Sequence, residues 1–257
     1  MMYKSSIGLI AVLGMSVALA TVATAPVQAL PEAQIVEKLQ KVPVFTITNK
    51  TGNFLQQSLG KAPKASLVTP VYMDLKDAQL LLKKLKKESP QKAKVAQIAV
   101  VPLSIIYKLQ LEAAKKPGSI NFVFVPTDQQ VKNAQMLLKK TYQFKTVPPV
   151  PIFMVAIKQQ DRYATIQENN LTPLFFSSQQ AQQWLDRVKQ KDPKLAAKAE
   201  IKVNALQSIL ADFQAKNYPE QQQFVLVPSI ESIEGARKLQ ATQPNANATP
   251  TTAAPKK

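Results

Sequence analysis

The sequence predicts an α/β fold made of two duplicated β/α half-domains, with helices flanking the sheets in one compact body. Short apolar segments alternate with amphipathic segments, a pattern typical of sheets covered by helices. The motif TPVY at 69–72 recurs 103 residues later as TPLF, and FVFVP at 122–126 recurs 102 residues later as FVLVP. The motif VPVF at 42–45 recurs 108 residues later as VPIF. This near-constant spacing predicts two copies of one unit, which we expect to be related by a pseudo-twofold axis.

The first copy has recognisable starts and stops for each element. Asp74 is a predicted N-cap of a helix with an apolar stripe, and this helix ends at Ser89-Pro90 because proline cannot continue it. A second helix is expected at 103–114, and Thr127 is expected to cap a third. The predicted strands of this copy are 44–48, 67–73, 94–101 and 120–125.

The second copy repeats this order with different residues. Ser177 or Ser178 takes the cap position of a helix that ends at Asp192-Pro193, and Ser229 caps the last helix. The elements expected between these helices are a strand at 199–203, a helix at 205–215 and a strand at 223–227. The two copies are assigned to residues 30–146 and 147–240.

Both ends of the chain differ in composition from the two copies. Lys4 precedes a mostly apolar run at 7–20, and the small residues near Ala29 suit signal peptidase, so we expect a signal peptide that is cleaved after Ala29. An uncleaved membrane anchor is the alternative. Residues 241–257 contain mainly Ala, Thr, Asn, Gln and Pro, a composition that predicts a disordered tail.

The absence of two residue types excludes several classes of enzyme. The chain contains no cysteine and no histidine. Disulfide frameworks, thiolate catalysis, His-dependent serine hydrolases and His-ligated zinc enzymes are therefore excluded. The Ser58-Leu59-Gly60-Lys61 and Lys50-Thr51-Gly52 segments resemble penicillin-recognising motifs, but their order is reversed and a Ser-Asp-Asn element is missing. We expect no catalytic, metal-binding or cofactor-binding residues.

Positive charge is concentrated in the first copy. The net charge is +17, and residues 30–146 hold 19 lysines against 7 acidic residues, whereas residues 147–240 hold 11 basic and 9 acidic residues. This distribution favours an anionic lipid surface or an acidic protein as a partner. Export and the scarcity of arginine argue against nucleic acid, and a merely solvated face is the simplest alternative. The candidate patch consists of Lys83, Lys84, Lys86, Lys87, Lys92 and Lys94.

The repeated motifs resemble a known family. The segments VPVF at 42–45, PVYMD at 70–74 and TPLFFS at 172–177, together with the doubled FVxVP strands, are similar to the Tic-twenty-two family of the chloroplast inner-envelope translocon and its cyanobacterial relatives. The resemblance covers most of residues 30–240. The bacterial type of signal favours a cyanobacterial relative in the periplasm, with the thylakoid lumen as the alternative.

The resemblance implies a non-enzymatic, chaperone-like factor for protein translocation and outer-membrane biogenesis. Its expected partners are unfolded or precursor proteins, with outer-membrane translocation machinery and peripheral contact with an anionic membrane as further candidates. Such a role requires exposed apolar grooves, but the sequence does not assign client-binding residues. The alternative function is a cationic adaptor that binds anionic lipid or an acidic protein through the lysine patch.

Overall fold

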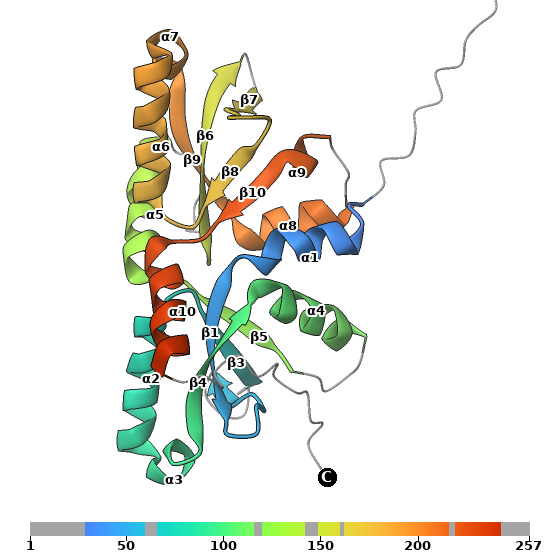
Figure 1. The fold of residues 1–257 in the computed structure, drawn as a ribbon, viewed down its shortest axis with the longest axis vertical. Coiled ribbons are helices and arrows are strands. Elements are labelled where there is room, and N and C mark those ends of the chain that lie inside the picture. The colour runs from blue at the N-terminus through green and yellow to red at the C-terminus, as the bar shows by residue number, and fades with distance from the viewer. Residues whose placement is uncertain are drawn as a thin grey trace, which may run out of the picture.

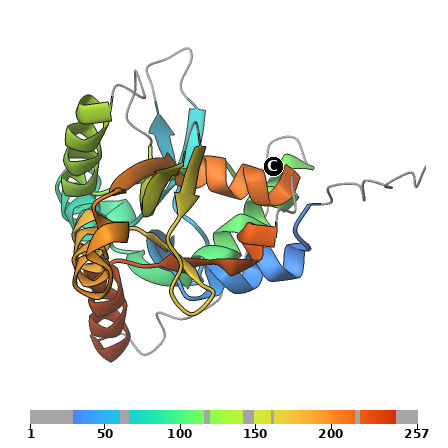
Figure 2. The same cartoon turned by 90° about the horizontal axis from the view of Figure 1, so that it is seen from above.

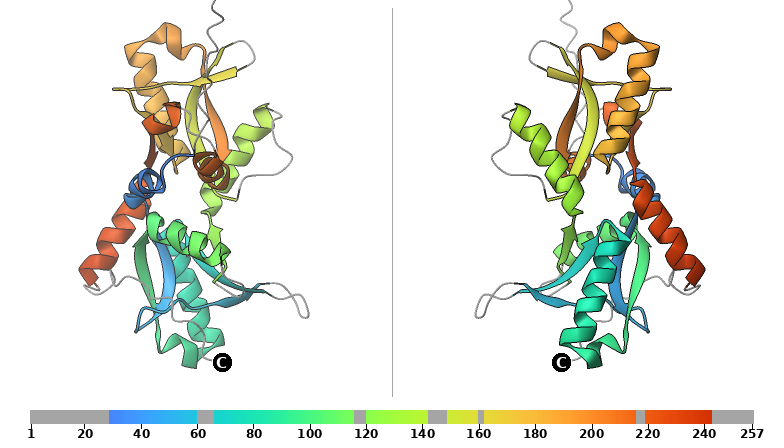
Figure 3. Two further views of the ribbon diagram at one scale, coloured as in Figure 1. Left: turned by 90° about the vertical axis from the view of Figure 1, so that its right-hand side faces the viewer. Right: turned by 90° about the vertical axis from the view of Figure 1, so that its left-hand side faces the viewer.

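The structure, a computed structural model, describes residues 29–59, 66–115, 120–141, 149–159, 162–215 and 219–242. It has two lobes stacked along its longest axis (Figure 1), and the side views show a narrower waist between them (Figure 3). The predicted signal peptide up to residue 28 and the predicted tail from residue 243 lie outside the described residues. No helix in the described part of the chain combines the length and the apolar character that a membrane span requires.

Ten helices and ten strands are described within these ranges. The helices are α1 (Glu32–Gln40), α2 (Leu75–Glu88), α3 (Pro90–Ala93), α4 (Leu103–Ala114), α5 (Asp128–Thr141), α6 (Ser178–Lys191), α7 (Pro193–Ala196), α8 (Leu206–Ala215), α9 (Pro219–Gln223) and α10 (Ile230–Thr242). The strands are β1 (Pro43–Asn49), β2 (Gln57–Leu59), β3 (Ser66–Tyr72), β4 (Ala96–Pro102), β5 (Phe122–Val125), β6 (Pro151–Gln159), β7 (Arg162–Thr165), β8 (Thr172–Phe175), β9 (Ala199–Ala205) and β10 (Phe224–Val227).

The two lobes contain sheets with the same strand order. In the first lobe, β5 pairs in parallel with β3, β3 pairs antiparallel with β1, and β1 pairs antiparallel with β4. In the second lobe, β10, β8, β6 and β9 follow in the same order with the same directions. The prediction of a mixed α/β fold with helix-flanked sheets in one body is confirmed. The strand order does not by itself establish a pseudo-twofold axis, so this part stays a prediction.

The register of the strands also corresponds between the lobes. Phe45 lies opposite Tyr72 in the first sheet, and Phe153 lies opposite Phe175 in the second. Thr69 of β3 lies opposite the first residue of β5, as Thr172 of β8 lies opposite the first residue of β10. The motifs that recur in the sequence therefore occupy corresponding places in the two sheets.

Each lobe is completed by a helix from the other copy. Helix α5, which follows the last strand of the first sheet, packs on β6 and β9 of the second sheet beside α6. Helix α10, which follows the last strand of the second sheet, packs on β1 of the first sheet beside α2. The side views show α5 in the upper lobe and α10 reaching down over the lower lobe (Figure 3). This exchange ties the lobes together.

A shared apolar core fills the waist. Helix α1 packs against α4 and β10, and the backbone N–H of Leu30 donates to the Phe213 carbonyl at 2.9 Å. Seen from above, α1, α4 and α8 lie on the side of the molecule opposite to α2 and α6 (Figure 2). Burial of large aliphatic and aromatic side chains is the main stabilising contribution here. The core includes Ile35, Leu39, Leu103, Ile106, Ile152, Leu174, Leu206 and Phe213.

Most predicted helix starts are confirmed by hydrogen bonds. The Asp74 carboxylate accepts from the Lys76 N–H at 2.8 Å, and the hydroxyls of Thr127 and Ser229 accept from N–H groups three residues later. Ser177 occupies the N-cap position of α6 but its side chain makes no capping hydrogen bond. Helix α1 was not predicted, and α10 continues to Thr242, two residues into the segment assigned to the tail.

Candidate functional site

A groove runs along the edge strand of the first sheet. Strand β4 ends the strand order on this side, and the groove, with a volume of about 530 Å³, separates the end of β4 from α10. Its apolar lining comes from Pro43, Val100, Val101, Pro102, Ile105, Ile233 and Ala236, and its polar lining from Gln40, Lys41, Arg237 and Gln240. We call this feature the edge groove. It combines an apolar surface, a basic rim and an edge strand.

Local structure explains why the edge groove has an apolar floor. Pro102 ends β4 and precedes the first turn of α4, so Ile105 projects beside the last strand residues. The helical spacing of Ile233, Ala236 and Gln240 places them on one side of α10. Ile105 and Ile233 are each half-buried, so they can still gain burial against a ligand. An edge strand beside apolar side chains is a suitable surface for an extended polypeptide segment.

A second cavity of about 330 Å³ lies at the waist. Equivalent residues of the two copies line it, including Val42 with Val150 and Pro43 with Pro151. The first turns of α2, α5, α6 and α10 also reach it. We call it the waist cavity. Among the described residues, no group of three or more Asp, Glu, His or Cys side chains is arranged to hold a metal ion.

The acidic side chains of the waist cavity are unevenly distributed. Asp74, Asp77 and Asp128 lie on the α2 and α5 side, with Glu231 on α10. Burial raises the pKa of Asp77 above its ordinary value, and the charges of Asp74 and Asp128 raise it further, while Lys76 opposes them. A raised carboxyl pKa means that the negative charge is less favourable in the folded than in the unfolded state. The waist cavity therefore carries local repulsion between carboxylates of the first copy.

The six lysines of the predicted patch lie together at the outer end of the first lobe. They come from the C-terminal half of α2, from α3 and from the turn after it (Figure 1). All six are exposed. Among the described residues, the only acidic partner of these lysines is Glu88, 3.9 Å from Lys84. We call this surface the cationic face.

The remaining residues of interest lie in the core, at a helix start or near the N-terminal end of α1. Trp184, Phe175 and Phe176, the aromatic residues of the second copy that could suggest a binding site, are instead buried in the core. Asp74 acts as a helix cap, as expected, whereas Asp77 faces the waist cavity. Ala29, the expected last residue of the signal peptide, is exposed and lies before the start of α1.

Sequence reasoning missed the edge groove. It depends on α10 lying beside the first sheet, although α10 follows the second sheet in the chain. The apolar spacing of Ile233 and Ala236 indicated a helix with one apolar side, but no local pattern tells which sheet such a helix covers. The available signal was Ile105, an apolar residue outside the side of α4 that Leu103 and Ile106 bury.

The fold and the groove define a two-lobed mixed α/β protein with an apolar groove at a sheet edge. The sequence model of the Tic22-like family matches residues 7–238. The chain belongs to the Tic22-like family, which confirms the resemblance seen in its motifs. No curated protein sequence matches the chain.

Two solved structures are similar to this chain. Tic22 of Anabaena, a protein of protein transport, is 35% identical, with a TM-score of 0.69 over 82% of this chain and 98% of that chain. Tic22 from Plasmodium falciparum is 21% identical, with a TM-score of 0.62 over 81% of this chain and 98% of that chain. At this lower identity the likeness concerns the fold alone.

Proposed function

We propose that this protein is a non-enzymatic, chaperone-like factor that holds precursor proteins during translocation and outer-membrane biogenesis. The observation that carries the proposal is the edge groove, where an apolar lining meets an edge strand. Unfolded clients present apolar side chains and unpaired backbone groups, and both can be accommodated at such a surface. The family membership and the protein-transport role of the Anabaena relative support the same proposal.

The proposal places the protein in an exported compartment. The apolar run at 7–20 and the small residues before Leu30 support a cleaved signal peptide, and the bacterial type of this signal favours the periplasm. The partners are precursor proteins in an extended state, with the outer-membrane translocation machinery as the receiving partner. Holding requires weak, reversible contacts, for which a half-buried apolar groove is suited.

A duplicated unit is the second part of the proposal. The common strand order, the common register and the reciprocal exchange of α5 and α10 support two copies related by a pseudo-twofold axis. An experimentally determined structure in which residues 69–135 superpose on 172–237 by a twofold rotation is the expected result. Two segments that do not superpose would contradict the duplication.

Aggregation of an unfolded client tests the holding function. An outer-membrane β-barrel protein is diluted from denaturant with and without this protein, and light scattering reports aggregation. The double variant Ile105→Ser, Ile233→Asn removes two half-buried aliphatic side chains from the edge groove. We expect it to bind the client at least about tenfold more weakly, because each lost side-chain burial is worth roughly 1.5–3 kcal/mol.

The matched control is Met136→Ser on α5, where an apolar side chain is 57% exposed away from the edge groove. This variant should suppress aggregation as well as the parent protein does. Circular dichroism and thermal unfolding establish that all variants are folded. The proposed function would be refuted by a parent protein that leaves aggregation unchanged, and the groove assignment by a double variant that retains full activity.

A further inference from the structure

The cationic face has an apolar residue within it. On α2, Leu80 lies one helical turn before Lys83 and Lys84 and two turns before Lys87, so these four side chains share one side of the helix. Leu80 is 64% exposed, and Val95, which follows the lysines of the α3 turn, is 45% exposed. Single exposed apolar residues are common on protein surfaces, so Leu80 and Val95 matter here only because they lie among the lysines of this face.

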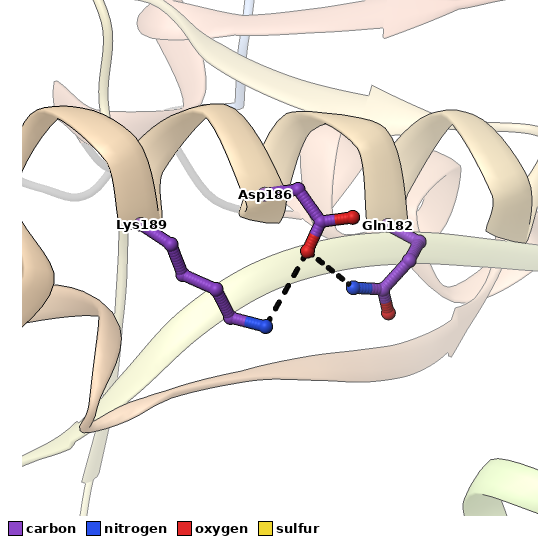
Figure 4. A network of polar contacts seen from close by, with 3 residues as sticks. All are labelled: Gln182, Asp186 and Lys189. Atoms are coloured by element: carbon purple, nitrogen blue, oxygen red, sulfur yellow. Dashed lines mark hydrogen bonds and ion pairs between the residues drawn. The ribbon is translucent and has the colours of Figure 1, made fainter.

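The second copy provides an internal comparison. Helix α6 occupies the place of α2, and its residues 103 positions later are Gln183 for Leu80, Asp186 for Lys83 and Gln190 for Lys87. Asp186 accepts a hydrogen bond from Gln182 at 2.9 Å and pairs with Lys189 at 3.4 Å (Figure 4). The α6 surface therefore neutralises part of its own charge.

Helix α2 has residues equivalent to Gln182 and Lys189 of α6 but none equivalent to the acidic Asp186. Gln79 and Lys86 occupy the positions of Gln182 and Lys189, while Lys83 stands where Asp186 would be. A negative charge is thus replaced by a positive one at the centre of the same arrangement. Lys83 and Lys87 are about one helical turn apart, about 6 Å along the axis, which is less than the Debye length of about 8 Å at physiological salt, so the fields of such neighbouring lysines add.

We propose that the cationic face binds the surface of a bilayer that carries anionic lipid headgroups. Lysine ammonium groups are mobile point charges that suit a diffuse layer of headgroups, whereas compact carboxylate or phosphate sites favour arginine forks. The exposed Leu80 and Val95 can enter the interfacial region between the lysines. Residues of this face line neither the edge groove nor the waist cavity. A helical surface without a cavity suits a flat partner.

The position of the cationic face is compatible with the proposed holding function but does not depend on it. The end of α2 and α3 form the outer tip of the first lobe (Figure 1). The edge groove is lined by the far end of β4 and by α10. A protein bound to a membrane by this tip would leave the edge groove and the whole second lobe accessible to clients.

Flotation with lipid vesicles tests the proposal. The chain from Leu30 to Lys257, the form that the predicted cleavage leaves, is mixed with vesicles of phosphatidylcholine alone or of phosphatidylcholine with phosphatidylglycerol. We expect binding only to the vesicles with phosphatidylglycerol. Raising NaCl from about 0.05 M to about 0.5 M should remove most of this binding, because the Debye length then falls below 5 Å.

The decisive variant transfers three residues of α6 to α2: Leu80→Gln, Lys83→Asp and Lys87→Gln. All three positions are exposed, and the chain already tolerates the new residues at the corresponding places of α6. Each charge near an anionic surface contributes roughly a fivefold change in affinity, so three charge units predict about a 100-fold loss.

The control removes three positive charges from the second lobe by Lys189→Gln, Lys194→Gln and Lys198→Gln. It should change vesicle affinity by no more than about twofold, because these lysines lie at the opposite end of the molecule. Equal losses in both variants would attribute binding to overall charge and overturn the proposal. Absence of binding to phosphatidylglycerol vesicles by the folded parent protein would also overturn it and favour an acidic protein as the partner.

Discussion

The two lobes use the same helix crossing with opposite chemistry. In the first lobe, Gly235 of α10 lies so close to α2 that a methyl group placed on it would be 2.9 Å from the Leu75 Cβ. In the second lobe the corresponding residues are Asn133 of α5 and Ser178 of α6, and the Asn133 amide donates to the Ser178 hydroxyl at 2.6 Å. One crossing is close and apolar, and the other is hydrogen-bonded.

This difference shows how similar units acquire different surfaces. The first-lobe crossing holds α10 against β1 and α2, and the edge groove remains between α10 and β4. In the second lobe, α5 packs directly against β9, the strand that corresponds to β4. The sheet edge with the groove is therefore a property of the first lobe, which also carries the cationic face.

The largest change in stability should come from adding a methyl group at the apolar crossing of α10 and α2. In Gly235→Ala the new methyl group meets the Leu75 Cβ at 2.9 Å and the Phe45 ring at 3.2 Å. Overpacking costs about 1–3 kcal/mol and the better helix propensity of alanine offsets roughly 1, so we expect a net loss of up to about 2 kcal/mol. Urea unfolding monitored by circular dichroism measures the change.

Asn133→Ala is the matched change at the polar crossing. It loses the hydrogen bond to the Ser178 hydroxyl and an exposed one from the Gln129 amide, but it gains helix propensity. Its free energy of unfolding should therefore change by less than about 1 kcal/mol. An equal or larger loss for Asn133→Ala than for Gly235→Ala would contradict the assignment of the close crossing to the first lobe.

A smaller change in stability is expected when the cap at the start of α6 is removed. The side-chain oxygen of Gln130 on α5 accepts from the Ser178 N–H at 2.9 Å, a role that Asp74 performs locally at the start of α2. Gln130→Ala should lower the free energy of unfolding by about 1 kcal/mol, the usual cost of a lost cap. Gln129→Ala, on the exposed side of the same turn, should stay within about 0.5 kcal/mol. Similar losses for both would exclude capping between helices.

The smallest change in stability is expected from Asp77, on the acidic side of the waist cavity. Because the pKa of Asp77 is raised in the folded state, its ionisation disfavours folding at neutral pH, and Asp77→Asn should stabilise the protein by less than about 1 kcal/mol. The gain should shrink as the pH falls through the raised pKa towards the ordinary value of 3.8, where the parent protein is also protonated. Urea unfolding across this pH range checks the sign.

The control for Asp77→Asn is the same substitution made in an Asp128→Asn protein. Asp128→Asn removes one of the two carboxylates that raise the pKa of Asp77, so Asp77→Asn should stabilise this background less than the parent. In the second copy the positions of Asp74, Asp77 and Asp128 hold Ser177, Gln180 and Ile230, so these three carboxylates are a feature of the first copy alone. A destabilised Asp77→Asn at neutral pH would contradict this account.

Local signals in the sequence predicted much of the fold. Asp74, Thr127 and Ser229 were correctly predicted as caps, because an N-cap needs only a side chain and an N–H two or three residues away. Prolines such as Pro90 and Pro193 marked the ends of α2 and α6 for a similarly local reason. Ser177 takes the predicted cap position of α6, but Gln130 of another helix provides the side-chain acceptor.

The features that the sequence did not predict depend on contacts between distant segments. Nothing near α5 or α10 indicates that each covers the sheet of the other copy, so the edge groove could not be predicted. Helix α1 has buried residues at Ile35 and Leu39, one turn apart, but its exposed remainder gives a weak pattern. The cationic face was predicted because α2 and α3 are neighbours in the chain, whereas its contrast with α6 required the structure.

Photo-cross-linking from the edge groove tests the holding function most directly. A photoreactive phenylalanine derivative replaces Ile233 in the edge groove or, as the control, Met136 on the exposed side of α5. In cells that export the protein, we expect adducts from position 233 to contain precursors of outer-membrane proteins and position 136 to yield few. Equal adducts from both positions, or none with such precursors from position 233, would contradict the account.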